Sequence, residues 1–498
     1  MSKRTQNGDF ITRMVTVICV FFVLSCGTKR PMATISTQYI EEIQDKPSEI
    51  KLQDEDFQKE FKKVFRKMSG DLPYPELMYK FYEGKKFQPV LMPRFLPDNQ
   101  LQVLLQYLNK SDSHGLDTTL FSPGTIKAWL DKLNERDAGA TLENFHTIAA
   151  LERAVAGSLM RYSDALQFGI TDPFKVYKSY TTPTLAPDSS SVARVFEIQD
   201  LKGYLASIQP AGKAYQALQK MLVTFQSLSD DPESDTVKTL IVNLERLRWK
   251  NKPAEPKFVS VNIADFSLDV IDQEKSVLHM KVCVGEPGER ETPQLGSMIH
   301  SVQVNPVWNI PQSIARNEIA KHAAEDRYYL ANSNINVYRK GKLISNPESI
   351  DWLSADLGEY MFQQQPGTEN ALGKIKFLFN NESSVYLHDT PVQSAFKEEM
   401  RAISHGCVRV EKPLALAFAL FGKGSQYDLI KKAMQRGYPR AKYIALPVHI
   451  PIRLRYYTAW ADVSNKKIRF CKDVYGLDEV LYSAIQKSIK ALSKRFTL

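Results

Sequence analysis

The hydrophobic positions of this chain follow two different periods, and the change between them divides it into two halves. From residue 57 to about residue 249, apolar residues recur every three or four positions, which is the spacing of an amphipathic helix. Helices are predicted around residues 57–65, 101–108, 126–133, 142–166 and 215–225. Asp98 and the pair Ser122-Pro123 precede two of these helices and are typical of helix N-termini.

Near residues 253–256 the period shortens to two. Val259, Val261 and Ile263 alternate with polar neighbours, and similar alternation recurs around residues 278–284, 302–304 and 375–379. Such alternation predicts half-buried antiparallel strands. It lapses between residues 311 and 366, where short helices are predicted instead. We therefore expect an α+β protein: an N-terminal helical scaffold domain, then a mostly antiparallel β domain with a helical insertion.

The N-terminus has the pattern of an export signal. Lys3, Arg4 and Arg13 precede an apolar run over residues 14–24, which is shorter than the ~20 residues that a spanning helix needs. A basic start, a short apolar segment and small residues predict a signal peptide over residues 1–26. Cys26 follows Leu-Ser, which resembles a bacterial lipobox and implies lipidation of Cys26. The alternative is an ordinary signal peptide with a chance cysteine.

Length and composition are those of a globular protein. The 498 residues suggest two to four domains at ~100–200 residues each. The net charge of +9 fits either a weak attraction to anionic cell-wall or membrane surfaces or a solvated basic surface without a partner. The chain has no zinc-finger, P-loop or RNA-binding signature, so nucleic acid is not an expected partner.

Five cysteines are present, and Cys19 and Cys26 lie in the signal segment. Cys283, Cys407 and Cys471 remain, an odd number for an exported protein. A disulfide between Cys283 and Cys471 could form, but both stand isolated in strand patterns, and we expect none. The chain has no Cys-x-x-Cys and no His/Cys ligand pair, so neither a metal nor another cofactor is expected.

The candidate chemistry lies in Ser404-His405-Gly406-Cys407-Val408-Arg409, with His388 located 19 positions before Cys407. A cysteine thiolate is a nucleophile, and a neighbouring imidazole can generate it and hold it. A glycine before the nucleophile lets the backbone turn sharply and brings amide groups close to a reacting carbonyl. A lone cysteine or histidine is more often a buried structural residue. The ordered string favours a cysteine acyl-transfer site.

This string and the upstream histidine resemble the signature of the L,D-transpeptidases of bacterial cell walls, which have a YkuD-type catalytic domain. Residues 304–311 are similar to the large two-lobed subgroup that carries a helical scaffold domain. Residues 114–117, together with Leu159, Arg161, Tyr162 and Asp164, resemble that scaffold. The resemblance implies that His388 and Cys407 carry the chemistry and that the substrates are peptidoglycan stem peptides. Residues 211–235 contain a predicted helix but lack the Gly-rich repeat of the peptidoglycan-binding module that often follows the scaffold.

Strand alternation places Tyr386 and His388 on one face, which is directed at the cleft if Val385 and Leu387 face the core. His388 is then the general base for Cys407. Its second ring nitrogen needs an orienting group, either the adjacent Asp389 or a backbone carbonyl. Tyr386 could donate a hydrogen bond in the cleft or could simply pack.

Backbone amides around His405, Gly406 and Cys407 are the candidate oxyanion donors. Ser404 and His405 are expected to shape this loop rather than to exchange protons.

Arg409 could hold a substrate carboxylate with two hydrogen bonds, or it could form a structural ion pair with Glu411. Trp308 could line the cleft or pack in the core. The insertion resembles the mobile cap of the family, and a cap that closes would exclude water; a packed insertion that never moves is the alternative.

These predictions divide the chain into a signal peptide (1–26), a tether (27–56), a helical scaffold domain (57–250), a catalytic domain (256–450, with the cap insertion at 311–366) and a C-terminal strand and helix extension of the catalytic domain (451–498). The resemblance implies an enzyme that forms 3-3 cross-links and is lipid-anchored in the cell envelope, facing the periplasm. The alternatives are an L,D-carboxypeptidase, which resolves the same thioester with water, and a non-catalytic wall-binding scaffold.

Overall fold

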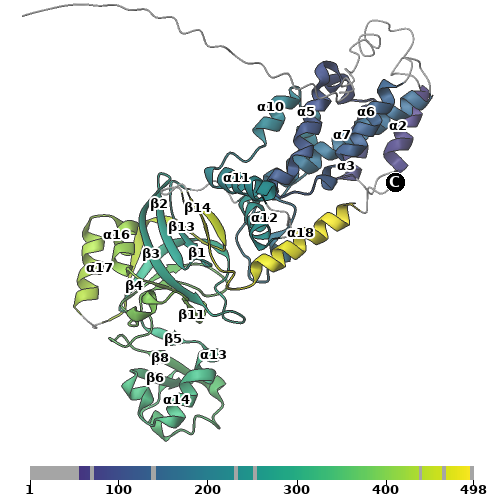
Figure 1. Ribbon diagram of the computed structural model, residues 1–498. Helices are drawn as coiled ribbons and strands as arrows, with labels where there is room; N and C mark the ends of the chain where they lie inside the picture. Colours follow the sequence, from purple (N-terminus) through teal and green to yellow (C-terminus); the bar gives the residue numbers. More distant parts are fainter. Residues whose placement is uncertain are drawn as a thin grey trace, which may run out of the picture.

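The computed structural model describes residues 55–67, 72–135, 142–228, 234–250, 255–436, 440–462 and 467–493. The predicted signal peptide, Cys26 and nearly all of the predicted tether lie outside these residues. Figure 1 shows a helical lobe at one end, a β domain in the middle and a small lobe at the other end. In the described part of the chain, no helix combines the length and the apolar character needed to cross a membrane.

The helical lobe is built around one long helix, α7 (Leu142–Phe168), which is buried along most of its length. Helices α2 (Glu55–Lys67) and α6 (Pro123–Asn134) pack against it. The other helices of this half are α3 (Pro75–Gly84), α4 (Met92–Phe95), α5 (Gln100–Asn109), α8 (Pro173–Val176), α9 (Ser190–Glu197), α10 (Leu201–Ser207), α11 (Lys213–Leu228) and α12 (Asp235–Arg248). The predicted helical half is confirmed. Its first helix already includes Glu55 and Asp56, the last two residues of the predicted tether.

Of the two predicted helix starts, the one at Ser122-Pro123 is confirmed and the one at Asp98 is wrong. The N-cap of α5 is Asn99 rather than Asp98, and both residues have left-handed backbone angles. Ser122 does occupy the N-cap position of α6, but at φ 48° its side chain accepts no amide of the helix. A capping side chain needs an extended backbone at that residue, which the left-handed conformation does not provide.

The β domain is a nine-stranded sheet in the order β11-β3-β12-β10-β9-β4-β13-β1-β2, and it closes on itself because β3 also pairs with β2. Three pairings are parallel, β1–β13, β10–β12 and β11–β3, and the others are antiparallel. The strands are β1 (Lys257–Asn262), β2 (Ser267–Asp272), β3 (Lys275–Gly285), β4 (Leu295–Val304), β9 (Ile375–Phe379), β10 (Leu387–His388), β11 (Ala402–Ser404), β12 (Val408–Val410) and β13 (Lys442–Arg455). The mostly antiparallel architecture is confirmed.

The predicted alternation sorts side chains as expected in β1 and β3. Val259 and Val261 are buried in the interior with Met280 and Val282. Helices α16 (Pro413–Phe421) and α17 (Ser425–Gln435) add to this core and lie together beside the sheet (Figure 1).

The insertion is not purely helical, which corrects the prediction for residues 311–366. It contains α13 (Gln312–Ile314), a π-helical turn at Ala315–Ile319, α14 (Ala320–Glu325) and α15 (Tyr329–Asn332). It also contains a four-stranded sheet in the order β5-β8-β6-β7, formed by β5 (Trp308–Ile310), β6 (Ile335–Arg339), β7 (Lys342–Leu343) and β8 (Tyr360–Gln364). Strands β5 and β7, with three and two residues, are too short to show period-two alternation, whereas β6 and β8, with five residues each, are not among the predicted strands. The insertion has a hydrophobic core of its own, which includes Val337 and Phe362.

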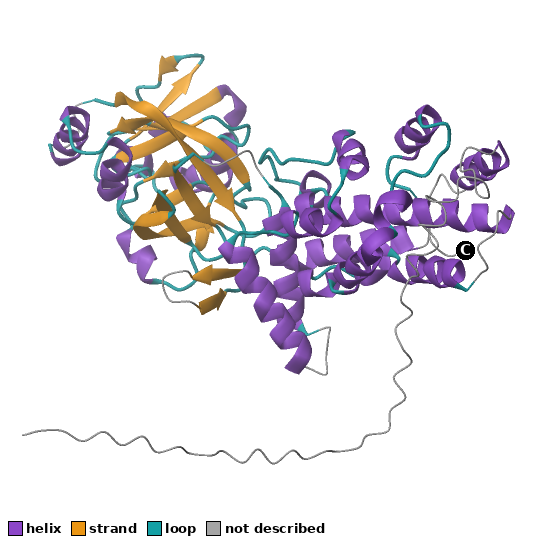
Figure 2. Ribbon diagram, turned by 90° about the horizontal axis from the view of Figure 1, so that it is seen from above, coloured by secondary structure: helices purple, strands orange, loops and turns teal. Residues whose placement is uncertain are grey.

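The predicted C-terminal extension (451–498) contacts both halves of the molecule. Residues 451–455 complete β13 and Tyr456 lies in the core of the β domain, whereas the later strands and helix contact scaffold helices. Strands β14 (Ala459–Asp462) and β15 (Lys467–Phe470) pair with each other and contact α11. Helix α18 (Leu477–Ser493) lies along α12, with Leu481 and Ile485 buried beside Trp249. Figure 2, a view from above, shows most of the helices on one side of the molecule and most of the strands on the other. The sequence of an amphipathic helix shows that the helix has an apolar face, but it does not show which surface packs against that face.

Candidate active site

Cys407 lies in a tight turn between β11 and β12. Gly406 has φ 111°, a backbone angle that side chains with a Cβ rarely adopt. Ser404 Oγ donates to the carbonyl oxygen of Cys407 (2.6 Å) and accepts the Gly406 amide (3.2 Å). Thr292 Oγ1 donates to the carbonyl oxygen of Gly406 (2.8 Å). The turn is therefore held on both sides of the cysteine, and Ser404 contacts only backbone groups in these bonds.

His388 ends the short strand β10, between Lys376 on β9 and Arg409 on β12. Its Nδ1 lies 2.6 Å from the carbonyl oxygen of Asp389, and because a carbonyl can only accept, Nδ1 carries the proton. Nε2 is then the nitrogen with a free lone pair. Burial, with smaller contributions from the charges of Arg409 and Lys376, lowers the pKa of His388 to about 3 despite the opposing hydrogen bond to Asp389, so the ring is neutral.

The orienting group is thus a backbone carbonyl, one of the two expected alternatives. The Asp389 carboxylate instead accepts the amide of Lys374 (2.9 Å) and lies against Gly373. A Cβ at Gly373 would come within 2.5 Å of that carboxylate, so the glycine makes the approach possible.

Tyr386 and His388 do share a face, with ring centroids 5.8 Å apart. The Tyr386 hydroxyl and its backbone amide both donate to the sulfur of Cys407. Burial raises the pKa of Cys407, while these hydrogen bonds and the charges of Lys376 and Arg409 oppose that rise. The resting pair is therefore a thiol and a neutral imidazole.

Arg409 forms no ion pair with any residue that the structure describes. Glu411, the expected structural partner, lies near Lys412 (3.5 Å) and accepts the amide of Lys281 (3.1 Å). Arg409 instead lines the same cavity as Cys407 and His388. Its charge remains available to an anion in that cavity.

The cavity has a volume of about 930 Å³ and lies between the Cys407 turn and the insertion. Trp308 lines it while also packing half-buried against the core of the insertion, so both expected roles apply to this side chain. Glu318, from the π-helical turn of the insertion, accepts from His405 Nε2 (2.6 Å) and pairs with Arg290 (3.0 Å). The insertion is thereby joined to the loop that carries the cysteine.

Sequence reasoning missed Lys376, Thr292 and Glu318. Lys376 alternates with the core residues Ile375 and Phe377, so its outward position could have been inferred, but not its proximity to Cys407. Thr292 lies in a loop and Glu318 in the π-helical turn of the insertion, and neither stands in a recognisable sequence signal. Cys283, Cys407 and Cys471 are all free thiols. Within the described ranges, no three His, Cys, Asp or Glu side chains gather as metal ligands would.

Comparisons with known proteins agree with both halves. Residues 256–421 match the family model YkuD, described as an L,D-transpeptidase catalytic domain, and residues 76–222 match the model of a scaffold domain. A Haemophilus influenzae protein named "Putative L,D-transpeptidase" is 29% identical over 311 residues, 61% of each chain. The chain thus aligns with less than two thirds of that relative. An L,D-transpeptidase structure from Mycobacterium smegmatis has 12% identity and a TM-score of only 0.21, and the match covers 40% of this chain and 58% of that one.

Proposed function

We propose that this chain is an enzyme that cross-links peptidoglycan stem peptides through a thioester on Cys407. Residues 256–421 match the model of an L,D-transpeptidase catalytic domain and residues 76–222 that of a scaffold domain, which supports the proposal. The observation that carries the proposal is the arrangement of Cys407 and a neutral, oriented His388 on one cavity. The donor is a tetrapeptide stem, cut before its terminal D-alanine. The acceptor is the side-chain amine of a second stem, which gives a 3-3 cross-link.

In acylation, His388 Nε2 takes the proton of the thiol as the sulfur attacks the donor carbonyl. The C–N bond to D-alanine then breaks, and the imidazolium returns the proton to the leaving amine. The Tyr386 hydroxyl donates to the sulfur and favours the thiolate, as do the nearby charges of Lys376 and Arg409. The neutral resting pair becomes charged only while the donor is bound.

The developing oxyanion needs donors that are not already occupied. The Gly406 amide donates to Ser404 Oγ, so the amides of His405 and Cys407 are the remaining candidates in this turn. Arg409 is the candidate for a substrate carboxylate, because no described acid neutralises it and it lines the cavity.

In deacylation, His388 removes a proton from the acceptor amine, which attacks the thioester and frees the thiol. Water in place of the amine would give an L,D-carboxypeptidase. The insertion lines the cavity and joins the cysteine loop through Glu318, which supports transfer over hydrolysis, because an insertion closed over the site would limit the entry of water.

Peptidoglycan as the substrate places the enzyme in the cell envelope. Residues 1–26 support export, and Cys26 is the proposed lipid attachment site, which would hold the catalytic domain near a membrane.

The test is intact-protein mass spectrometry of the chain starting after Cys26, incubated with a disaccharide-tetrapeptide, with analysis of both protein and products. We expect an adduct on Cys407 and a dimer that has lost one D-alanine. Cys407→Ala should form neither and should keep the thermal stability of the parent chain. Tripeptide without dimer would favour the carboxypeptidase. Product formation by Cys407→Ala would exclude the thioester, and no adduct or product would favour a binding role.

A further inference from the structure

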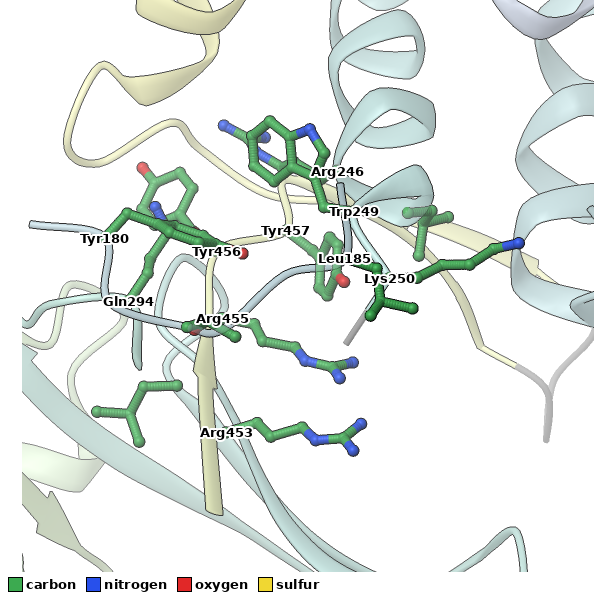
Figure 3. A pocket seen from close by; sticks show the side chains of 13 residues that line it. Tyr180, Leu185, Arg246, Trp249, Lys250, Gln294, Arg453, Arg455, Tyr456 and Tyr457 are labelled. Carbon is green, nitrogen blue, oxygen red and sulfur yellow. The ribbon is translucent and has the colours of Figure 1, made fainter. Parts of the chain in front are cut away.

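A second cavity, of about 450 Å³, lies where the scaffold meets the β domain. One wall is the segment 180–185, another is the end of α12 with Trp249 and Lys250, and the third is the end of β13 with the residues that follow it, up to Tyr457 (Figure 3). It shares no lining residue with the cavity at Cys407. Its volume is within the range of small-molecule sites, roughly 300–1,000 Å³.

The walls of this cavity are held by a hydrogen bond between the two domains and by contacts within the scaffold. The amide of Thr181 donates to the carbonyl oxygen of Gln294 (2.9 Å), and the amide of Leu185 donates to the carbonyl oxygen of Lys250 (2.7 Å). The ring of Trp249 packs against Tyr180, with centroids 5.8 Å apart. The cavity is therefore a formed feature of the domain junction rather than a gap between loose surfaces.

The cavity carries positive charge that no described acidic side chain neutralises; Arg453 also lies over the ring of Phe258, 5.0 Å from its centroid. Arg453 and Arg455 are two positions apart on β13, so their side chains leave the same face of the strand. Figure 3 shows both side chains and Lys250 extending toward the same side. None of the three forms an ion pair with a described residue, and none of the described lining residues is acidic. The fourth cation, Arg246, is different, because it pairs with Asp478.

Partial burial and mutual repulsion make the charged forms of these side chains less stable than they are in water. Arg453 and Arg455 are half-buried, and burial together with the charge of Arg455 lowers the pKa of Arg453. Burial also lowers the pKa of Lys250. Arginine keeps its proton in proteins, so a bound anion, rather than deprotonation, is the means of offsetting this repulsion. Tyr457, Trp249 and Leu185 complete the lining with apolar and aromatic surface.

We propose that this cavity at the domain junction is a second ligand site, which binds a small molecule with at least two oxyanion groups beside an apolar portion. Two guanidinium groups on one strand face suit paired carboxylate or phosphate oxygens, because each guanidinium can donate two parallel hydrogen bonds. Carboxylates of wall peptides and phosphates of envelope metabolites share this chemistry. The proposal does not depend on the reaction at Cys407.

Binding is tested by isothermal titration calorimetry on the Cys407→Ala chain starting after Cys26, which excludes turnover. The two probes are a disaccharide-tripeptide, which supplies carboxylates, and inorganic pyrophosphate. We expect at least one probe to bind, and the double variant Arg453→Gln/Arg455→Gln to lower its affinity at least tenfold. Binding of the first probe alone identifies carboxylates as the ligand, and binding of the second alone identifies phosphates.

The matched control is Lys432→Gln/Arg436→Gln, at the end of α17 and directly after it, which removes the same charge from an exposed surface and should leave affinity unchanged. Lys250→Gln is a milder variant in case the double arginine change prevents folding, and it should also weaken binding. The proposal is wrong if neither probe binds, or if the pocket variants bind as tightly as the control. If the tripeptide bound only at Arg409 in the first cavity, the pocket variants would bind it as tightly as the control does.

Discussion

Burial keeps both Cys407 and His388 uncharged at rest, and this has a consequence for reactivity. The pKa of Cys407 is raised above its ordinary value of 9.0, and that of His388 is lowered to about 3. At every pH between these values the thiol is protonated and the imidazole is neutral. The reactive thiolate is therefore a minor species in the free enzyme at neutral pH.

We expect alkylation of Cys407 by iodoacetamide to rise about tenfold per pH unit between about pH 6 and pH 9, without a plateau at low pH. Peptide-level mass spectrometry across that range would measure it. Cys407→Ala serves as the control for alkylation of Cys471, which is also partly accessible. A rate that stays constant down to about pH 5 would instead indicate a thiolate–imidazolium pair.

Tyr386 offers a second prediction at this scale, because its hydroxyl donates to the sulfur of Cys407. Tyr386→Phe removes that donor while keeping the ring. A hydrogen bond to a charged group is worth about 1.5–3 kcal/mol, so acylation should slow by roughly 10- to 100-fold. Single-turnover mass spectrometry would measure the rate, and an unchanged melting temperature would confirm folding. An acylation rate equal to the parent's would make Tyr386 a packing residue only.

Among the elements, the insertion matters most to the site because Glu318 joins it to the cysteine loop. Glu318→Gln removes the charge that His405 and Arg290 contact. These side chains are about one third exposed, so the variant should lose no more than about 1 kcal/mol of the free energy that holds the insertion against the cysteine loop. The equilibrium constant for opening should therefore rise by up to about fivefold. Hydrogen exchange should accelerate in residues 312–332, and the proportion of hydrolysed product should rise.

The matched control is Glu325→Gln on α14, whose pair with His322 is mostly exposed and away from the cysteine loop. It should change neither exchange nor product ratio. Because the pKa of Glu318 is lowered in the folded chain, its contribution is full above the ordinary pKa of 4.5 and is lost as the pH falls through the lowered value. Equal exchange in the two variants would show that Glu318 does not hold the insertion.

In the whole molecule, the packing of α12 within the scaffold half depends on a buried ion pair in this helix. Arg248 donates to Glu245 (2.7 and 3.0 Å), and both side chains are fully buried. Glu245 also accepts the amides of Ile170 and Thr171, while Arg248 donates to the carbonyl oxygen of His114. The pair therefore ties α12 to two separate loops of the scaffold.

Arg248→Met should lower the free energy of unfolding by about 3–5 kcal/mol, because it leaves the Glu245 carboxylate buried without its cation. Chemical denaturation followed by circular dichroism would measure this change. The control is Lys127→Met, which removes an exposed i,i+4 pair with Asp131 and should cost no more than about 0.5 kcal/mol. Equal losses in the two variants would contradict the importance of the buried pair.

Much of the architecture could be predicted because its signals are local. Helix α7 and strand β3 follow from the spacing of neighbouring apolar residues, and the cysteine turn follows from a continuous motif with a glycine at φ 111°. The placement of Tyr386 beside His388 follows from strand alternation. In each case the information lies within a few residues of the feature, where the covalent chain alone restricts the geometry.

The rest depended on contacts between residues far apart in the chain. His405 meets Glu318 across 87 positions, and α18 lies on α12 rather than on the β domain. The carbonyl of Asp389 rather than its carboxylate orients His388, and Arg453 and Arg455 face a cavity that the scaffold closes. A sequence pattern states that a surface is apolar or charged, but the partner is chosen by the packing of the whole chain.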